Sequence, residues 1–303
     1  MSVHRNEDGA PAHSVDDTED SEVITMRFDH PRTVRLGAAL LGLTLLGACT
    51  RSNVEVFVEG SPIHGANGII FDARDRMHVA SVVGREIVVM DRESGAVVDR
   101  IGPERGVESP DDLIIDTDGT LYWTSILTGE VGRLAPDGDQ RGQSVSPGVN
   151  PITLSDDGRL FVALDFMGDA LYELDPALEE PPRLIVENLG MMNGMDWGPD
   201  GSLYGPIWTG GRVARVNVAT GALSSVAEGF AVPAAVKFDS QGRLHVLGTE
   251  RGEIVRVDRA TGAKEVLSTA VVGGDNLAFD SSDRLFVSSW LDGSVVEVRS
   301  DGS

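Results

Sequence analysis

The sequence is poor in the residues that redox and thiolate chemistry require. It contains one cysteine, Cys49, which excludes both an internal disulfide and a cluster of cysteine ligands. Lysine is scarce as well, because Lys237 and Lys264 are the only two and all other basic residues are arginine. With 48 acidic and 25 basic residues, the formal net charge is −23. This charge repels polyphosphates, so we expect no nucleic-acid partner.

The sequence signatures of several enzyme classes are also missing. The chain has no GxSxG nucleophile elbow, no HExxH helix, no P-loop and no dinucleotide-binding fingerprint. No segment stands out as helical either. What the chain does contain is a series of short apolar stretches separated by reversals rich in Asp, Gly and Ser, which is typical of β-hairpins.

One such hairpin unit recurs six times. The copies begin at residues 67, 111, 150, 193, 234 and 275, and the clearest of them, 275–287, reads DNLAFDSSDRLFV. Corresponding positions in successive copies are 44, 39, 43, 41 and 41 residues apart; they are Met77, Leu121, Leu160, Leu203, Leu244 and Leu285. A period near forty with short strands predicts an all-β fold, a six-bladed β-propeller with four-stranded blades.

The sixth unit ends too early to complete its blade. After the segment 294–299 no room remains for a fourth strand before Ser303. The segment 54–58, VEVFV, alternates apolar and polar residues and precedes the first blade without a partner of its own. We therefore predict that it closes the ring beside the last blade, removing the open sheet edge, so that 49–303 form a single propeller domain.

The N-terminal region has the layout of a secretory signal. An apolar run, LGAALLGLTLLGA, follows Arg27, Arg32 and Arg35 and ends immediately before Cys49. Its last residues resemble the lipobox of bacterial lipoproteins. We expect a signal peptide at 26–48 and lipidation of Cys49, giving an exported protein anchored by lipid to the bacterial cell envelope. An ordinary signal peptide or an uncleaved anchor is the alternative.

The first 25 residues do not fit this layout. They are acidic, whereas a signal peptide begins with a positively charged region. We expect a disordered or non-native extension at 1–25, with Met26 as an alternative start of the chain.

The leading residue of each first strand is a candidate metal ligand. In a propeller these residues lie near the central axis at one face, and here five of the six carry a side-chain oxygen; the candidates are Asn67, Asp111, Asn150, Asn193 and Asp275. Such oxygens suit Ca²⁺, with Mg²⁺, Mn²⁺ and Zn²⁺ as alternatives. The sixth residue is Ala234. In the competing interpretation each Asn or Asp only caps the turn that enters its strand.

Asp112 and Asn276 each lie one residue further along their strands. They are weaker candidates, because alternating side chains in a strand point in opposite directions.

Loops between second and third strands should surround the same face. They contribute Asp165, Trp208, Glu250 and Trp290, which we predict to bind substrate. A hydrolase also needs a proton acceptor, and His64 has the most suitable unperturbed pKa, with Asp111 and Asp275 as further candidates. A solvated loop residue is the alternative for His64.

Three short motifs add a family resemblance. The residues NGMDW at 193–197, SPDD at 109–112 and DNL at 275–277 resemble the senescence marker protein/gluconolactonase family of six-bladed propellers. The resemblance covers 54–303 and extends to the paraoxonases. It implies lactonase or related esterase activity, with a divalent cation held on the axis by a Glu, two Asn and an Asp. Asn150 and Asn193 fall on the two family Asn positions.

Both family carboxylates are replaced in this chain. Asn67 stands at the family Glu position and Ala234 at the family Asp position. Asp111 and Asp275 each lie one blade further round, which keeps the spacing between the two carboxylates. We therefore expect a rotated variant of the metal site.

The sequence thus predicts a monomeric, metal-dependent hydrolase of a small-molecule lactone or ester that contacts the membrane only through its lipid anchor. Two alternatives stay open. The first is a non-catalytic propeller that binds a ligand or a protein and holds a structural cation, and loss of both family carboxylates favours it. The second is a lyase or synthase on the same scaffold.

Overall fold

The computed structural model describes residues 54–58 and 62–299, which belong to the unit Cys49–Ser303. The predicted extension at 1–25, the signal peptide at 26–48 and the lipidation site Cys49 lie outside the described residues. Over the ranges that are described, no helix has both the length and the apolar character to cross a membrane.

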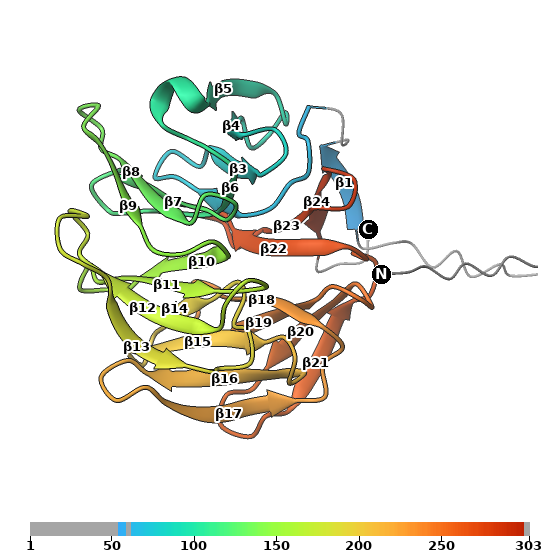
Figure 1. Cartoon of the computed structure of the whole chain (residues 1–303). Helices are drawn as coiled ribbons and strands as arrows, with labels where there is room; N and C mark the ends of the chain where they lie inside the picture. Colours follow the sequence, from blue (N-terminus) through green and yellow to red (C-terminus); the bar gives the residue numbers. More distant parts are fainter. Residues whose placement is uncertain (1–53, 59–61, 300–303) are drawn as a thin grey trace, which may run out of the picture. The chain divides into compact units, whose positions relative to one another are not determined.

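Six four-stranded antiparallel sheets succeed one another along the chain (Figure 1). Blade one comprises β2 (Ile69–Phe71), β3 (Met77–Ser81), β4 (Glu86–Met90) and β5 (Val97–Ile101), followed by the short 3₁₀ helix η1 (Pro103–Arg105). Blade two comprises β6 (Pro110–Ile115), β7 (Leu121–Ser125), β8 (Glu130–Leu134) and β9 (Gln140–Ser144). Blade three comprises β10 (Val149–Leu154), β11 (Leu160–Leu164), β12 (Ala170–Leu174) and β13 (Arg183–Glu187).

The second half of the ring follows the same order. Blade four comprises β14 (Asp196–Gly198), β15 (Ser202–Ile207), β16 (Arg212–Asn217) and β17 (Ala222–Glu228). Blade five comprises β18 (Pro233–Phe238), β19 (Leu244–Gly248), β20 (Glu253–Val257) and β21 (Lys264–Ser268). Blade six comprises β22 (Gly274–Phe279), β23 (Leu285–Ser289) and β24 (Val295–Val298), and β1 (Val54–Val58). The predicted six-bladed propeller is therefore confirmed.

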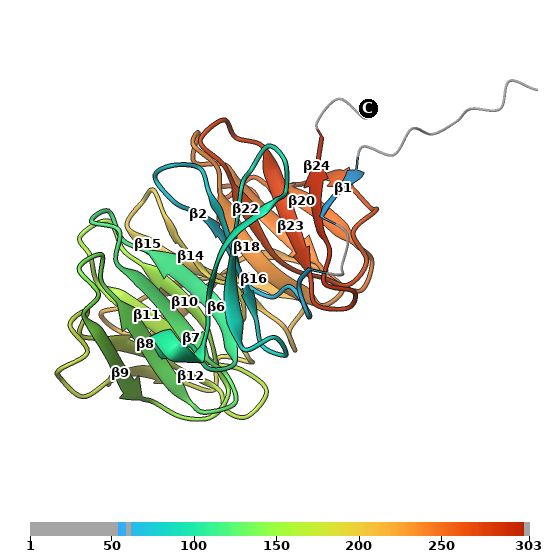
Figure 2. The same ribbon diagram turned by 90° about the horizontal axis from the view of Figure 1, so that it is seen from above.

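Strand β1 supplies the strand that the last blade lacks. It pairs antiparallel with β24, and Val54 lies opposite Val298 in the register. Figure 1 shows β1 in blue beside β24 in red, and the view from above in Figure 2 shows the same pair. The predicted closure of the ring by an N-terminal strand is confirmed.

The hydrophobic core lies between neighbouring blades. Phe161 of blade three stacks on Trp197 of blade four, with ring centroids 5.4 Å apart. Leu171, Leu203 and Ala214 belong to the same buried cluster, so residues from both blades contribute to it. The second strands β3, β7, β11, β19 and β23 are buried along their whole length. Each blade is therefore covered on both faces by its neighbours.

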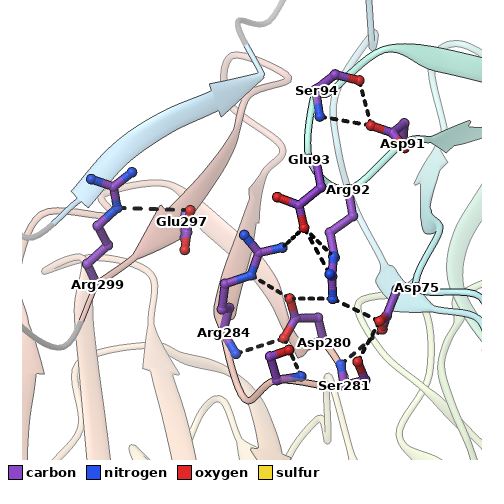
Figure 3. A network of polar contacts seen from close by, with 11 residues as sticks. Asp75, Asp91, Arg92, Glu93, Ser94, Asp280, Ser281, Arg284, Glu297 and Arg299 are labelled. Carbon is purple, nitrogen blue, oxygen red and sulfur yellow. Dashed lines mark hydrogen bonds and ion pairs between the residues drawn. The ribbon is translucent and has the colours of Figure 1, made fainter.

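A polar network joins blade six to blade one (Figure 3). Nη1 of Arg92 donates hydrogen bonds to Oδ2 of Asp75 at 2.8 Å and to Oδ2 of the buried Asp280 at 3.2 Å. Nη2 of Arg284 donates to Oε1 of Glu93 at 3.1 Å. The seam between the first and last blades is thus held by ion pairs as well as by apolar packing.

Candidate functional site at the propeller axis

The first strands carry a β-bulge at the positions that the sequence singled out. In β6, Pro110 lies opposite Ser125 and Leu113 opposite Trp123. The β6 strand therefore has one more residue between these two pairs than β7 has. Strands β10, β18 and β22 have a register shift at the corresponding place. A bulge bends its strand and changes the direction of its side chains. Asp111, Asn150, Ala234 and Asp275 therefore all lie on bulges.

Four polar side chains near the starts of the first strands interact electrostatically with one another. The Asn67 side chain forms a hydrogen bond with Asp275, and the charges of Asp165 and Asp275 both act on Asp111. We call Asn67, Asp111, Asp165 and Asp275 the axial cluster. They come from blades one, two, three and six, so only the closed ring places them beside each other.

The carboxyl groups of the axial cluster resist ionisation. Burial raises the pKa of Asp111 well above its usual range, and the charge of Asp275 raises it further. Burial also raises the pKa of Asp275 to about 7, and the charge of Asp112 adds to the effect. Burial also raises the pKa of Asp165 to about 7. Like charges in a dehydrated site produce this effect when no cation balances them.

Asp165 was predicted to bind substrate, and the structure buries it completely. Its Oδ1 accepts a hydrogen bond from the backbone nitrogen of Phe166 at 2.8 Å, while Oδ2 has no hydrogen-bond partner within the described residues. Asp165 itself is anchored through its backbone nitrogen, which donates to the carbonyl of Gly148 at 2.8 Å. A buried carboxyl oxygen without a partner is costly, so it marks a position where a ligand would be favourable.

The remaining amide candidates have partly local roles. Oδ1 of Asn193 accepts a hydrogen bond from the backbone nitrogen of Gly194 at 2.8 Å, the local contact that the turn-capping interpretation describes. Asn150 is buried, and its backbone carbonyl accepts a hydrogen bond from Oγ1 of Thr124 at 2.5 Å. Their metal-binding role stays a prediction.

The loop candidates differ in their exposure. His64 and Glu250 are exposed, and half of the Trp290 surface is accessible. Trp208 is half-buried and packs against the edge of Phe166, with ring centroids 4.6 Å apart. The catalytic role of His64 and the substrate contacts of the other three residues stay predictions.

The next residues along two of the first strands form a second polar contact, although the alternation of side chains in a strand had made them weaker candidates. Nδ2 of Asn276 donates a hydrogen bond to Oδ1 of Asp112 at 3.0 Å. Oδ2 of Asp112 accepts from the backbone nitrogen of Ile152 at 3.1 Å. Burial raises the pKa of Asp112 to about 6, whereas the charge of Lys237 opposes the rise. At a bulge, consecutive residues can both face the channel. The two consecutive polar residues in each of the motifs SPDD and DNL could have indicated such a bulge.

The axial cluster offers the donors that a hard divalent cation prefers. Asn67, Asp111 and Asp275 supply one amide and two carboxylate oxygens, and Asp165 has an oxygen without a partner. In the described part of the chain, no three or more His, Cys, Asp and Glu side chains are grouped closely enough to hold a metal. A cation would therefore depend on amide oxygens or water to complete its coordination.

Cavities also lie between neighbouring blades. One of about 810 Å³ separates blades four and five and is lined by Asp200, Arg215, Arg256 and Glu265, among others. Arg215 pairs with Asp200 at 3.2 Å, and Arg256 pairs with Glu265. Because these charges already have partners, the axial cluster with its unbalanced carboxyl groups is the stronger candidate site.

The fold and the axial cluster define a six-bladed propeller with a polar site on its axis. No protein-family model matches the chain, and no curated protein matches it. Solved structures do match. A gluconolactonase from Xanthomonas campestris has a TM-score of 0.65 at 16% identity, over 80% of this chain and 88% of that one. Virginiamycin B lyase from Staphylococcus aureus has a TM-score of 0.61 at 13% identity, over 80% and 98%.

A luciferin-regenerating enzyme is similar to the same extent, with a TM-score of 0.63 at 15% identity, over 81% of this chain and 94% of that one. At these identities the likeness shows the fold alone. It confirms the fold that the family resemblance implies, while membership of the gluconolactonase family stays a prediction. The named activities differ among these propellers, so the chemistry of this chain has to be argued from its own residues.

Proposed function

We propose that the protein is a divalent-cation-dependent hydrolase of lactones or related esters, with its active site at the axial cluster. The observation that carries the proposal is the convergence of Asp111 and Asp275 beside Asn67, with the pKa of both carboxyl groups raised. Titratable groups with strongly shifted pKa values on a channel axis are typical of functional sites. Gluconolactonase-like propellers among the similar structures support the reaction class.

Residues of the axial cluster would hold the cation and transfer the proton during ester hydrolysis. Asn67, Asp111 and Asp275 would hold the cation, and when bound it would supply Lewis-acid polarisation of the carbonyl and acidification of water. Asp275, with Asp111 and His64 as alternatives, would act as the proton acceptor. It would accept the proton of the attacking water as the new carbon–oxygen bond forms. The same proton would pass to the alcohol oxygen when the ester bond breaks.

The test combines cation binding with turnover. The purified full chain would be titrated with Ca²⁺ by calorimetry and assayed on small lactones and aryl esters, with and without EDTA. Asp111→Asn and Asp275→Asn should weaken binding and lower kcat/KM by at least about a hundredfold, the usual scale of acid–base catalysis. The exposed Asp156→Asn is the matched control. Hydrolysis that survives both EDTA and the two substitutions would disprove the proposal.

A non-catalytic binding propeller is the second candidate. Asn67 and Ala234 stand where the resembled family has its two carboxylates, and this difference favours a structural cation without catalysis. One bound Ca²⁺ with no turnover of any ester would support that function. A lyase on the same scaffold would instead yield an unsaturated product that contains no added water.

A further inference from the structure

Large apolar side chains are exposed in the loops between second and third strands. We call six of them the apolar rim: Val83, Leu127, Phe166, Met167, Trp290 and Leu291. At least half of each residue's surface is accessible, and the rim includes members from blades one, two, three and six. These are the blades that supply the axial cluster. Exposed apolar residues gathered in equivalent loops are typical of a binding surface.

The rim and the axial cluster lie at the same end of the channel. In each blade the loop from the second to the third strand emerges where the first strand begins. Backbone hydrogen bonds tie these loops to the segments that enter the next first strand. The nitrogen of Ala66, next to Asn67, donates to the carbonyl of Ser289 at 3.2 Å, and Gly148 donates to Ile126 at 2.9 Å.

Phe166 links the two features directly. It follows Asp165 in the chain and has a φ of 60°, a left-handed conformation that is strained for a bulky residue. The ring is half exposed and meets the Trp208 ring edge-on, with centroids 4.6 Å apart and planes at 70°. The structure thus places an aromatic pair beside the buried carboxyl group, at the expense of backbone strain.

The charged groups of these loops restrict the ligand further. Glu130, Glu250 and Asp292 are exposed and acidic. Arg85 is the basic residue of the β3–β4 loop, and its guanidinium group is already bound to the Glu108 carboxylate, with Nε donating to Oε2 at 2.8 Å. Arg251, in the β19–β20 loop, has its Nη1 3.9 Å from Oε1 of Glu253. Acidic side chains thus outnumber arginines in these loops, which disfavours anionic ligands. The aliphatic side chains and the Phe166 ring offer no hydrogen bonds to the hydroxyl groups of a sugar.

We propose that the substrate is a neutral or cationic lactone or ester with an apolar arm, and that the arm binds on the Phe166–Trp208 pair. The inference that the molecule carries a lactone or ester group depends on the proposed hydrolase function. The inference that it carries an apolar arm depends on the exposed apolar side chains alone. A compact sugar lactone lacks the part that these side chains would bind.

Two measurements on the full chain test the proposal separately from the hydrolase function. Binding is followed by tryptophan fluorescence and calorimetry with 1-methyl- and 1-octyl-2-pyrrolidinone, which are inert to ester hydrolysis. Turnover is followed with γ-valerolactone, γ-octalactone, γ-decalactone and glucono-δ-lactone. Each methylene that is fully buried strengthens binding about fourfold, so octyl should bind at least about tenfold more tightly than methyl. The value of kcat/KM should rise along the alkyl series.

The variants Phe166→Ala and Trp208→Ala should remove most of this chain-length dependence. Leu184→Ala is the matched control, because Leu184 is an equally exposed apolar residue on the outer strand β13. Octyl binding that depends on Phe166 in a protein that hydrolyses no lactone would uphold the apolar site and reject the hydrolase function. Equal binding of both pyrrolidinones, or a preference for glucono-δ-lactone, would overturn the inference. A third outcome would overturn the inference in favour of a membrane surface. In that case Phe166→Ala and Trp208→Ala would both lose binding to anionic or neutral phospholipid vesicles, while the dependence of ligand binding on alkyl-chain length would stay as in the parent.

Discussion

Asn276 and Asp112 meet across the propeller channel, where the amide nitrogen of one donates to the carboxyl oxygen of the other at 3.0 Å. The bond joins blade six to blade two and links residues 164 positions apart in the sequence. Both residues are buried, so each depends on the other to satisfy its polar atoms.

Removing either partner should therefore destabilise the ring. We expect Asn276→Ala and Asp112→Ala each to lower the free energy of unfolding by about 1–3 kcal/mol, because a buried polar group loses its partner. The double variant should cost about 1 kcal/mol less than the sum of the two single variants. Urea denaturation of the four proteins measures this coupling. Strict additivity would show that the contact does not stabilise the fold.

Asp165 should make stability depend on pH. Burial raises its pKa from an ordinary value to about 7, so the folded state holds a proton that the unfolded state releases near pH 4. The stabilisation is full below about pH 4 and is lost as pH rises to 7, at about 1.4 kcal/mol per pH unit.

The variant Asp165→Asn should lack this slope. In EDTA, its free energy of unfolding relative to the parent should increase steadily between pH 5 and pH 7, as measured by urea denaturation. Asp156→Asn, at an exposed position, is the control and should follow the parent. Parallel curves for the parent and Asp165→Asn would mean that Asp165 is ionised throughout.

Calcium should stabilise the folded protein if the axial cluster binds it. At a hundredfold excess over Kd, binding to the native state alone adds about 2.7 kcal/mol to the free energy of unfolding. Thermal denaturation with and without Ca²⁺ measures this shift. The double variant Asp111→Asn with Asp275→Asn should show no shift, because both carboxylates proposed to hold the cation are gone. A calcium-dependent shift that persists would place the cation elsewhere.

Arg92 should be important for the seam between the first and last blades. It neutralises Asp280, whose side chain is fully buried, and it also binds Asp75 at 2.8 Å. Arg92→Met should cost about 1–3 kcal/mol, because a buried carboxylate loses one of its cations. Arg141→Met is the comparison, since Arg141 pairs with the exposed Asp139 and Glu179, and its loss should have a smaller effect. Equal effects would show that burial at the seam contributes nothing.

Strand β1 should be required for a closed ring. Deleting 54–58 exposes the backbone edge of β24, with which β1 pairs over most of its length. We expect Tm to fall by roughly 10 °C or more, in line with a loss of several kcal/mol from a domain of this size. Differential scanning calorimetry of the deletion variant provides the measurement. A variant that melts with the parent would show that the sheet edge tolerates exposure.

The fold was predictable because its information is local and repeated. A hairpin pattern recurring every forty residues specified the blades, and the unpaired segment 54–58 specified the closure. Among the leading residues, Asn67, Asp111 and Asp275 interact in the structure, and the metal-binding role of all five stays a prediction. The rest depended on packing. The hydrogen bond between Asn276 and Asp112 joins two blades, so no single repeat encodes it, and the burial of Asp165 could not be read from its loop sequence.

The pairing of β1 with β24 also has a consequence for the order of events during synthesis. Strand β1 is synthesised before β24, so the ring cannot close until residues 295–298 have been made. Contacts between such distant parts of a chain form slowly. The axial cluster, which takes residues from blades one and six, can assemble only at that final step, so an incomplete chain would have the blades without the site.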